Sequence, residues 1–197
     1  MRIAQHLIHM LLYADDLVLM SRSKEGLQQQ LDALASFCQY RDMEVNLSKT
    51  EIVVFRPASS PARPAEWQWQ YNGAPVIVSQ EFRYLGIIFH ETAGVKVAIS
   101  TLAGAARRAM WAMLGKIRAA GIVDISMKLQ LFRAVVAPIM EYCSGVWGPD
   151  LLVGCHRQGQ VFENELQQIQ TTFLRQLGRL RKSVPTAIVH REFGMPV

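Results

Sequence analysis

The sequence has few cysteines and no long apolar run. Its three cysteines among 197 residues, Cys38, Cys143 and Cys155, are scattered and odd in number, which argues against a disulfide framework and for a reducing compartment. Cys155-His156 and Cys143 lack the C-x2-C or H-x3-H spacing of zinc sites, so structural cysteines are favoured. No run approaches the roughly 18 apolar residues that cross a bilayer. We therefore expect no membrane segment and a soluble, intracellular protein.

The chain also lacks a strong charge of either sign. Its net charge of +5 is compatible with a phosphate-rich partner, but an excess this small is common in proteins that never meet nucleic acid. Half of the 197 residues are hydrophobic, which excludes a disordered tail and allows a core of one domain or one and a half.

The most informative stretch is Leu11–Met20, in which two short apolar runs flank Asp15 and Asp16. The pattern predicts a buried hairpin with the acids at its tip. Carboxylates beside a buried hairpin need water or a cation, and all-oxygen ligands favour Mg²⁺ or Mn²⁺, as in metal-assisted phosphoryl transfer. Because strand side chains alternate, Asp15 is preferred over Asp16 as the ligand. The alternative is an ordinary exposed turn, which aspartate commonly forms.

Tyr13-Ala14-Asp15-Asp16, followed by Leu17, resembles the Y-A-D-D signature of reverse transcriptases, especially those of non-LTR (LINE-type) retrotransposons. Two further blocks follow in the family's order, VNLSKTE at residues 45–51 and FRYLG at residues 82–86. The resemblance implies RNA-directed DNA synthesis by two-metal nucleotidyl transfer. It implies an RNA template, a DNA primer, deoxynucleoside triphosphates, Mg²⁺ (or Mn²⁺) as cofactor, no membrane partner and action in the nucleus.

The resemblance also implies roles for individual residues. Asp15 and Asp16 would be catalytic and bind metal, and Lys49 would donate a proton to the departing pyrophosphate. An ammonium group can stabilise developing phosphate charge in this way, although a solvated turn lysine is the alternative for Lys49. Residues 82–89 resemble the primer-grip element. We expect Arg83, Tyr84 and Gly86 in this element to contact the primer or other nucleic acid. Tyr13 in the Y-A-D-D signature is a further expected contact.

In the family, a second metal-binding aspartate lies on an earlier strand, tens of residues before the signature. Only twelve residues precede Tyr13, so we expect this chain to lack that ligand and to be inactive alone. The predicted fold class is α+β, a partial polymerase palm followed by an all-helical thumb-like region. The palm, with its hairpin, one helix and a small antiparallel sheet, covers residues 1–92, and the thumb covers residues 93–197, truncated at its C-terminal end.

Within residues 1–92, a helix is predicted from Ser23, capped by Ser21 or Ser23. Its apolar stripe comprises Leu27, Leu31, Leu34 and Phe37. Strands are predicted at Glu44–Leu47 and Ile52–Phe55, and the proline-rich residues 56–64 form a connector. A further hairpin turns at Asn72-Gly73, and its aromatic residues are either a covered face or a surface for stacking bases.

Residues 93–197 show helical spacing. Helices are predicted at Val95–Ala120, Met127–Val136, Val161–Leu180 and Ile188–Val197, with the second ending or bending at Pro138. The predicted inward residues of the first helix, which Gly121 ends, are Ile99, Leu102, Ala106, Met110, Met113 and Ile117, and those of the third helix are Leu166, Ile169, Phe173, Leu177 and Leu180. Arg107 and Arg118 lie eleven residues apart and share one azimuth, so they either contact phosphates or are simply solvated. Tyr142 and Trp147 resemble the segment after the thumb, where a tyrosine and a tryptophan close a small helical core.

Two alternative functions differ in class from a polymerase segment. One is a non-catalytic nucleic-acid-binding module, or a decayed transposon remnant. The other is a signalling receiver domain, which also begins with a strand ending in paired aspartates but needs a helix directly after them. Leu17-Val18-Leu19-Met20 is a strand pattern and disfavours the receiver domain. The oligomeric state and the template preference are left open.

Overall fold

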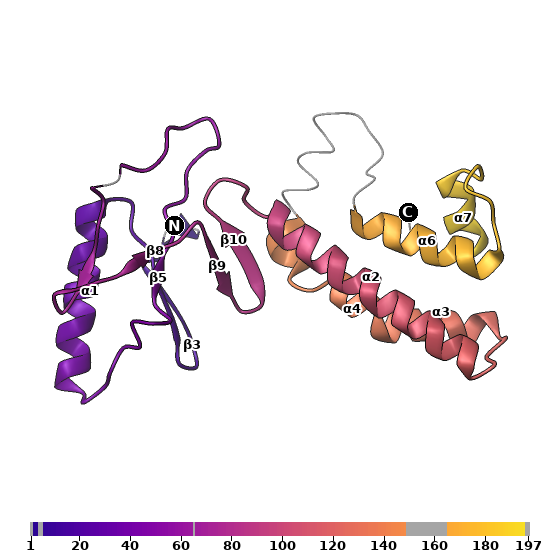
Figure 1. Cartoon of the computed structure of the whole chain (residues 1–197), viewed down its shortest axis with the longest axis horizontal. Helices are drawn as coiled ribbons and strands as arrows, with labels where there is room; N and C mark the ends of the chain where they lie inside the picture. The colour runs from indigo at the N-terminus through magenta and orange to yellow at the C-terminus, as the bar shows by residue number, and fades with distance from the viewer. Residues whose placement is uncertain (1, 4–5, 65, 149–164, 196–197) are drawn as a thin grey trace. The chain divides into compact units, whose positions relative to one another are not determined.

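The computed structural model describes residues 2–3, 6–64, 66–148 and 165–195 (Figure 1). The chain forms two compact units. The N-terminal unit comprises residues 1–82 and 90–92, and the C-terminal unit comprises residues 83–89 and 93–197. The predicted palm and thumb assignment, with its boundary at residue 92, stays a prediction.

The strands of the N-terminal unit form short two-stranded ladders around one long helix, α1 (Lys24–Tyr40). The antiparallel pairs are β1 (Arg2–Ile3) with β2 (His6–Leu7), β3 (Met10–Tyr13) with β4 (Asp16–Leu19), and β6 (Gln70–Tyr71) with β7 (Ala74–Pro75). A fourth pair, β5 (Glu51–Ile52) with β8 (Ile77–Val78), is parallel. The mixture of helix and small sheets agrees with the predicted class, but the parallel pair was not expected.

Helix α1 begins as predicted, because the Ser23 hydroxyl accepts a hydrogen bond from the Gly26 amide at 3.1 Å. Its buried stripe runs through Leu31, Ala35 and Cys38, at intervals of four and three residues. Phe37 lies about 120° from Leu31 around the helix and is 51% exposed. The prediction that Phe37 belongs to the apolar stripe is therefore wrong.

Helix α1 packs on the β6 hairpin, and this contact forms the core of the N-terminal unit. The Trp69 indole is buried and donates a hydrogen bond to the Lys24 carbonyl at 3.0 Å. The Gln28 amide pairs with both backbone groups of Gln70, at 2.8 and 3.0 Å. Tyr71 is also buried, and its burial, together with a side-chain hydrogen bond to Cys38, raises the pKa of Tyr71. The aromatic residues Trp69 and Tyr71 are therefore a covered face of the hairpin, as one of the two predicted alternatives proposed, and not a surface for stacking bases.

The predicted turn at Asn72-Gly73 is confirmed, and both residues have positive φ, 47° and 77°. The predicted strand Glu44–Leu47 is wrong, because these residues are not in a strand and lead into a turn. In that turn the Asn46 side chain accepts hydrogen bonds from the Ser48 amide and hydroxyl, at 3.0 and 2.7 Å. The predicted strand Ile52–Phe55 is reduced to β5, which ends at Ile52.

The C-terminal unit contains the tip of one hairpin and a set of helices. The hairpin pairs β9 (Glu81–Tyr84) with β10 (Ile87–His90). The helices are α2 (Lys96–Ala119), α3 (Ile125–Val135), α4 (Ala137–Met140), residues 144–148, α6 (Glu165–Gly178) and α7 (Thr186–Glu192). None of the helices in the described ranges is both long and apolar enough to cross a membrane.

Helix α2 is the centre of this unit and packs against α3, α4 and α6. Six inward positions were predicted from the 3.6-residue period, and all six are buried: Ile99, Leu102, Ala106, Met110, Met113 and Ile117. The chain leaves the helix at Gly121, which has a φ of 65°, as expected for a helix stop. Pro138 lies in α4, just after α3 ends at Val135, so the predicted break is confirmed.

Two helix predictions near the C-terminal end need correction. Helix α6 buries the predicted Leu166, Ile169 and Phe173, but it ends at Gly178, so Leu180 lies beyond it. Helix α7 spans Thr186–Glu192 rather than Ile188–Val197, because it starts directly after Pro185. The predicted helix residues 161–164 and the Cys155-His156 pair lie outside the described residues.

Removing the Phe173 ring should destabilise the C-terminal unit strongly. Phe173 is fully buried and stacks on Phe132 with ring centroids 4.3 Å apart. We expect Phe173→Ala to lower the free energy of unfolding by about 3–5 kcal/mol, as measured by urea denaturation. The matched control, Phe37→Ala, removes the same ring from an exposed site and should change it by less than about 0.5 kcal/mol. Equal losses in the two variants would contradict this core assignment.

Candidate functional site

The acidic pair lies at a tight two-residue turn. The register pairs Tyr13 with Asp16, so Ala14 and Asp15 form the turn and Asp16 is the first residue of β4. Both aspartates are exposed. Ala14 has a φ of 51°, a conformation that costs a residue other than glycine about 1–2 kcal/mol. The turn is therefore held in place by the pairing of β3 with β4.

The prediction of a buried hairpin is wrong for β3. All four of its residues are exposed, with Leu12 at 66% and Tyr13 at 61%, whereas Leu17–Leu19 on β4 are half-buried. The physical reason is that, in the described part of the chain, β3 pairs with β4 alone and none of its residues belongs to either hydrophobic core.

The acidic pair alone does not make a complete metal site. Mg²⁺ and Mn²⁺ take about six ligands, most of them oxygen, and two neighbouring carboxylates supply only part of that set. No group of three or more His, Cys, Asp or Glu side chains gathers anywhere in the described ranges. The residues present therefore have the right chemistry for a divalent ion but do not form a full cage for one. The assignment of Asp15 and Asp16 as metal ligands stays a prediction.

Lys49 lies in the turn that Asn46 organises, where its amide donates to the Asn46 carbonyl at 3.1 Å. Its side chain is exposed. Among the described residues, no hydrogen bond or ion pair joins it to Asp15 or Asp16. Lys49 shares the N-terminal unit with the acidic turn, and its catalytic role stays a prediction.

Three of the expected nucleic-acid contacts lie together on the β9–β10 hairpin. Its turn is Leu85-Gly86, with φ values of 46° and 83°. Arg83 is exposed, Tyr84 is half-buried, and Ile87 at the start of β10 is buried in the core of the C-terminal unit. The hairpin therefore exposes Arg83 and Gly86 at its turn, while the buried Ile87 anchors it to the core of the C-terminal unit.

A second group of cations lies on α2. The helix contains five cations, Lys96, Arg107, Arg108, Lys116 and Arg118, and no acidic residue. Arg107 and Arg118 are both exposed, and they lie within about 20° of each other around the helix and about 16 Å apart along it. Trp111, which the sequence analysis missed, is 48% exposed between them. Trp111 follows Arg107 by four residues, and this spacing indicates that both lie on the same face of the helix.

Tyr142 lies in the turn after α4, close to Trp147 in the helix at residues 144–148. The Trp147 indole is buried and donates a hydrogen bond to the Tyr142 carbonyl at 2.7 Å. The Tyr142 ring remains partly exposed and its hydroxyl contacts the β9–β10 turn. Trp147 belongs to the core of the C-terminal unit and Tyr142 does not, so the expectation that the two residues together close a helical core stays a prediction.

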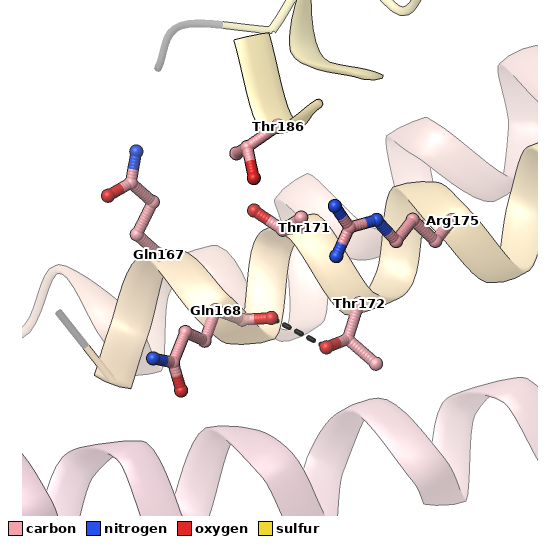
Figure 2. A pocket seen from close by; sticks show the side chains of 6 residues that line it. All are labelled: Gln167, Gln168, Thr171, Thr172, Arg175 and Thr186. Atoms are coloured by element: carbon pink, nitrogen blue, oxygen red, sulfur yellow. Dashed lines mark hydrogen bonds between the residues drawn. The ribbon is translucent and has the colours of Figure 1, made fainter. Parts of the chain in front are cut away.

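A polar pocket of about 280 Å³ lies between α6 and α7 (Figure 2). It is lined by Gln167, Gln168, Thr171, Thr172, Arg175 and Thr186. Arg175 donates a hydrogen bond to the Val184 carbonyl at 2.8 Å, and Thr171 pairs with the buried His190 at 2.9 Å. None of the predicted site residues lines this pocket, and Arg175 and Thr171 each make a hydrogen bond within the protein.

The predicted site residues thus fall in both units. The N-terminal unit carries Tyr13, Asp15, Asp16 and Lys49, and the C-terminal unit carries Arg83, Tyr84, Gly86, Arg107 and Arg118. Residues 2–89 match the family model described as reverse transcriptase (RNA-dependent DNA polymerase). Residues 2–89 are therefore similar to a reverse transcriptase segment. The match contains the acidic turn, Lys49 and the β9–β10 turn.

Two curated relatives of the chain are RNA-directed DNA polymerases from the mobile element jockey, an element of the non-LTR type. The chain is 23% identical over 192 residues to the RNA-directed DNA polymerase from mobile element jockey of Drosophila melanogaster, covering 93% of this chain and 19% of that protein. It is 24% identical over 142 residues to the same polymerase of Drosophila funebris, covering 69% of this chain and 15% of that one. The chain thus spans less than one fifth of these relatives. No solved structure shows a significant match.

The comparisons favour a retrotransposon reverse transcriptase over the other functions considered. The structure also excludes the receiver-domain alternative on its own terms. That fold requires a helix directly after the paired aspartates, and here Asp16 begins strand β4.

The positive φ of Ala14 predicts how the acidic turn responds to substitution. Ala14→Val should speed amide hydrogen exchange in residues 10–20 by about tenfold or more, because a β-branched residue tolerates positive φ poorly. The control Ala14→Gly, which permits this φ, should not speed it. Exchange is read by mass spectrometry of the native chain. Equal rates in both variants would show that the turn adopts another conformation.

Proposed function

We propose that this chain holds the primer and template within an RNA-directed DNA polymerase and contributes acidic ligands to its metal site. The observation that carries the proposal is the reverse transcriptase match over residues 2–89, which contains the acidic turn, Lys49 and the β9–β10 turn. The partners are an RNA template, a DNA primer and deoxynucleoside triphosphates, and the place of action is the nucleus.

Asp15 and Asp16 are proposed to supply carboxylate oxygens to Mg²⁺ or Mn²⁺. Reverse transcriptases as a family use divalent metal ions. When bound, such ions activate the attacking hydroxyl and stabilise the leaving pyrophosphate. Because the described residues do not complete the ligand set, we assign no step through the metal to this chain. Lys49 is proposed as the proton donor to pyrophosphate, since its ammonium is exposed on a turn of the same unit.

The β9–β10 hairpin and α2 are proposed to contact the nucleic acid backbone. Arg83 is an exposed cation next to the hairpin turn, where the Gly86 backbone is also exposed to an approaching sugar-phosphate strand, and Tyr13 is a further contact. On α2, Arg107 and Arg118 are separated by about 16 Å, which matches about five base steps at 3.4 Å each. Trp111 between them offers a flat face on which a base or sugar can stack.

The incomplete ligand set gives a first test. We expect the chain alone, supplied with a DNA primer on an RNA template and Mg²⁺, to extend the primer no more than its Asp15→Asn variant does. A primer-extension gel with single-nucleotide resolution measures this. Extension by the unmodified chain that Asp15→Asn abolishes would show that its own residues complete the metal site.

The cations of α2 give a second test through the salt dependence of binding. Each phosphate contact contributes about −0.9 to the slope of log K against log salt, so Arg107→Ala and Arg118→Ala should each make the slope shallower by about one. Fluorescence anisotropy of a labelled primer–template across a salt series measures the slope. Trp111→Ala should lower the affinity without changing the slope, because stacking releases few counterions.

Lys116→Ala is the matched control for this series. Lys116 is an exposed cation on the same helix, but it lies about 180° from Arg107 around the axis. Removing it should leave the slope unchanged. An effect of Lys116→Ala equal to that of the arginine variants, or no binding by the unmodified chain, would contradict the proposed interface.

A further inference from the structure

A tyrosine from the helical region contacts the turn of the β9–β10 hairpin. The Tyr142 hydroxyl donates a hydrogen bond to the Leu85 carbonyl at 2.7 Å, across 57 residues of sequence. Both residues belong to the C-terminal unit. The contact is partly open to solvent, with Tyr142 46% exposed, so packing of the ring alone does not account for its position.

The turn that receives this hydrogen bond has an unusual conformation. Leu85 and Gly86 both have positive φ, which a type I′ hairpin turn requires at its two central residues. Leucine has no local preference for this region, so the pairing of β9 with β10 and contacts from outside the hairpin must keep it there. The hydrogen bond from Tyr142 to the Leu85 carbonyl is such a contact.

Gly86 shows how closely the tyrosine approaches. A Cβ atom built on Gly86 would lie 3.3 Å from both Cε1 and the hydroxyl oxygen of Tyr142, closer than most such contacts. The absence of a side chain at residue 86 therefore lets the Tyr142 ring lie against the turn. Gly86 thus serves both the backbone conformation and the approach of the ring.

Tyr142 is itself held by the core. Its carbonyl accepts the 2.7 Å hydrogen bond from the buried Trp147 indole, and the Ser144 amide donates to the Glu141 carbonyl at 3.0 Å to close the local turn. The hairpin has a second anchor in Ile87, which is buried in the same core as Trp147. The turn is thus fixed at two points. Ile87 holds it through burial in the core, and Tyr142 holds it through the hydrogen bond to the Leu85 carbonyl.

We propose that Tyr142 is a positioning residue for the primer terminus, acting through the Leu85-Gly86 turn. This inference rests on the proposed function, in which this turn and its neighbour Arg83 contact the primer. The ligand class is a nucleic acid strand with a recessed 3′ end. Tyr142 acts by keeping the turn in the conformation that presents Arg83, so loss of its hydroxyl changes recognition of the recessed end and not general attraction to phosphate.

The test compares Tyr142→Phe, which removes one oxygen, with Tyr40→Phe, which removes the same oxygen from an exposed tyrosine on α1. The first measurement is hydrogen exchange at residues 84–88, without nucleic acid. Tyr142→Phe should speed exchange there by about two- to tenfold, the equivalent of one lost hydrogen bond, and leave α2 unchanged. Tyr40→Phe should change neither segment.

The second measurement is anisotropy with two DNA–RNA hybrids of equal length, one with a recessed 3′ primer end and one blunt. The unmodified chain should prefer the recessed hybrid, and Tyr142→Phe should reduce that preference by about two- to tenfold while binding the blunt hybrid equally well. A preference that persists in Tyr142→Phe, or unchanged exchange at the turn, would overturn the inference alone. If the unmodified chain binds neither hybrid, the proposed function fails and the inference fails with it.

Discussion

The burial of one apolar stripe on α2 determines how the C-terminal unit is organised. Six inward residues, from Ile99 to Ile117, lie on one side of the helix and pack against α3, α4 and α6. Each fully buried side chain of this kind contributes on the order of 1.5–3 kcal/mol. Because that side must face the core, Arg107, Trp111 and Arg118 must face outward. The same core receives Ile87 and Trp147, and so it also fixes the β9–β10 hairpin.

The N-terminal unit depends on a different contact, that of α1 with the β6 hairpin. The short ladders of this unit cannot be stable alone, because a two-stranded ribbon is marginal in water. Trp69 and Gln28 join the helix to β6 through side-chain to backbone hydrogen bonds, which replace a neighbouring strand. The acidic turn is at the end of the β3–β4 ribbon, whose second strand is only half-buried. The catalytic candidates therefore belong to the less buried part of the unit.

The features predicted correctly from the sequence are those with a long period or a specific turn signal. The α2 stripe repeats over six positions, and Asn72-Gly73 has few alternative conformations, so both were predictable. Strands of two residues carry no periodic signal, which is why the extent of β5 differs from the predicted Ile52–Phe55. Phe37 fits a three-residue spacing from Leu34, but the buried side of α1 passes through Ala35 and Cys38 instead. The pairing of Tyr142 with Leu85 joins residues 57 apart and has no local pattern at all.

The exposure of β3 has a consequence for the behaviour of the purified chain. Its residues Met10–Tyr13 are apolar or aromatic, carry no charge and have no strand on their other side in the described ranges. Natural proteins protect such an edge with lysine, proline or a bulge, and none of these interrupts β3. The edge is thus a template for adding a strand from another molecule, and concentrated solutions of the chain will tend to aggregate through it.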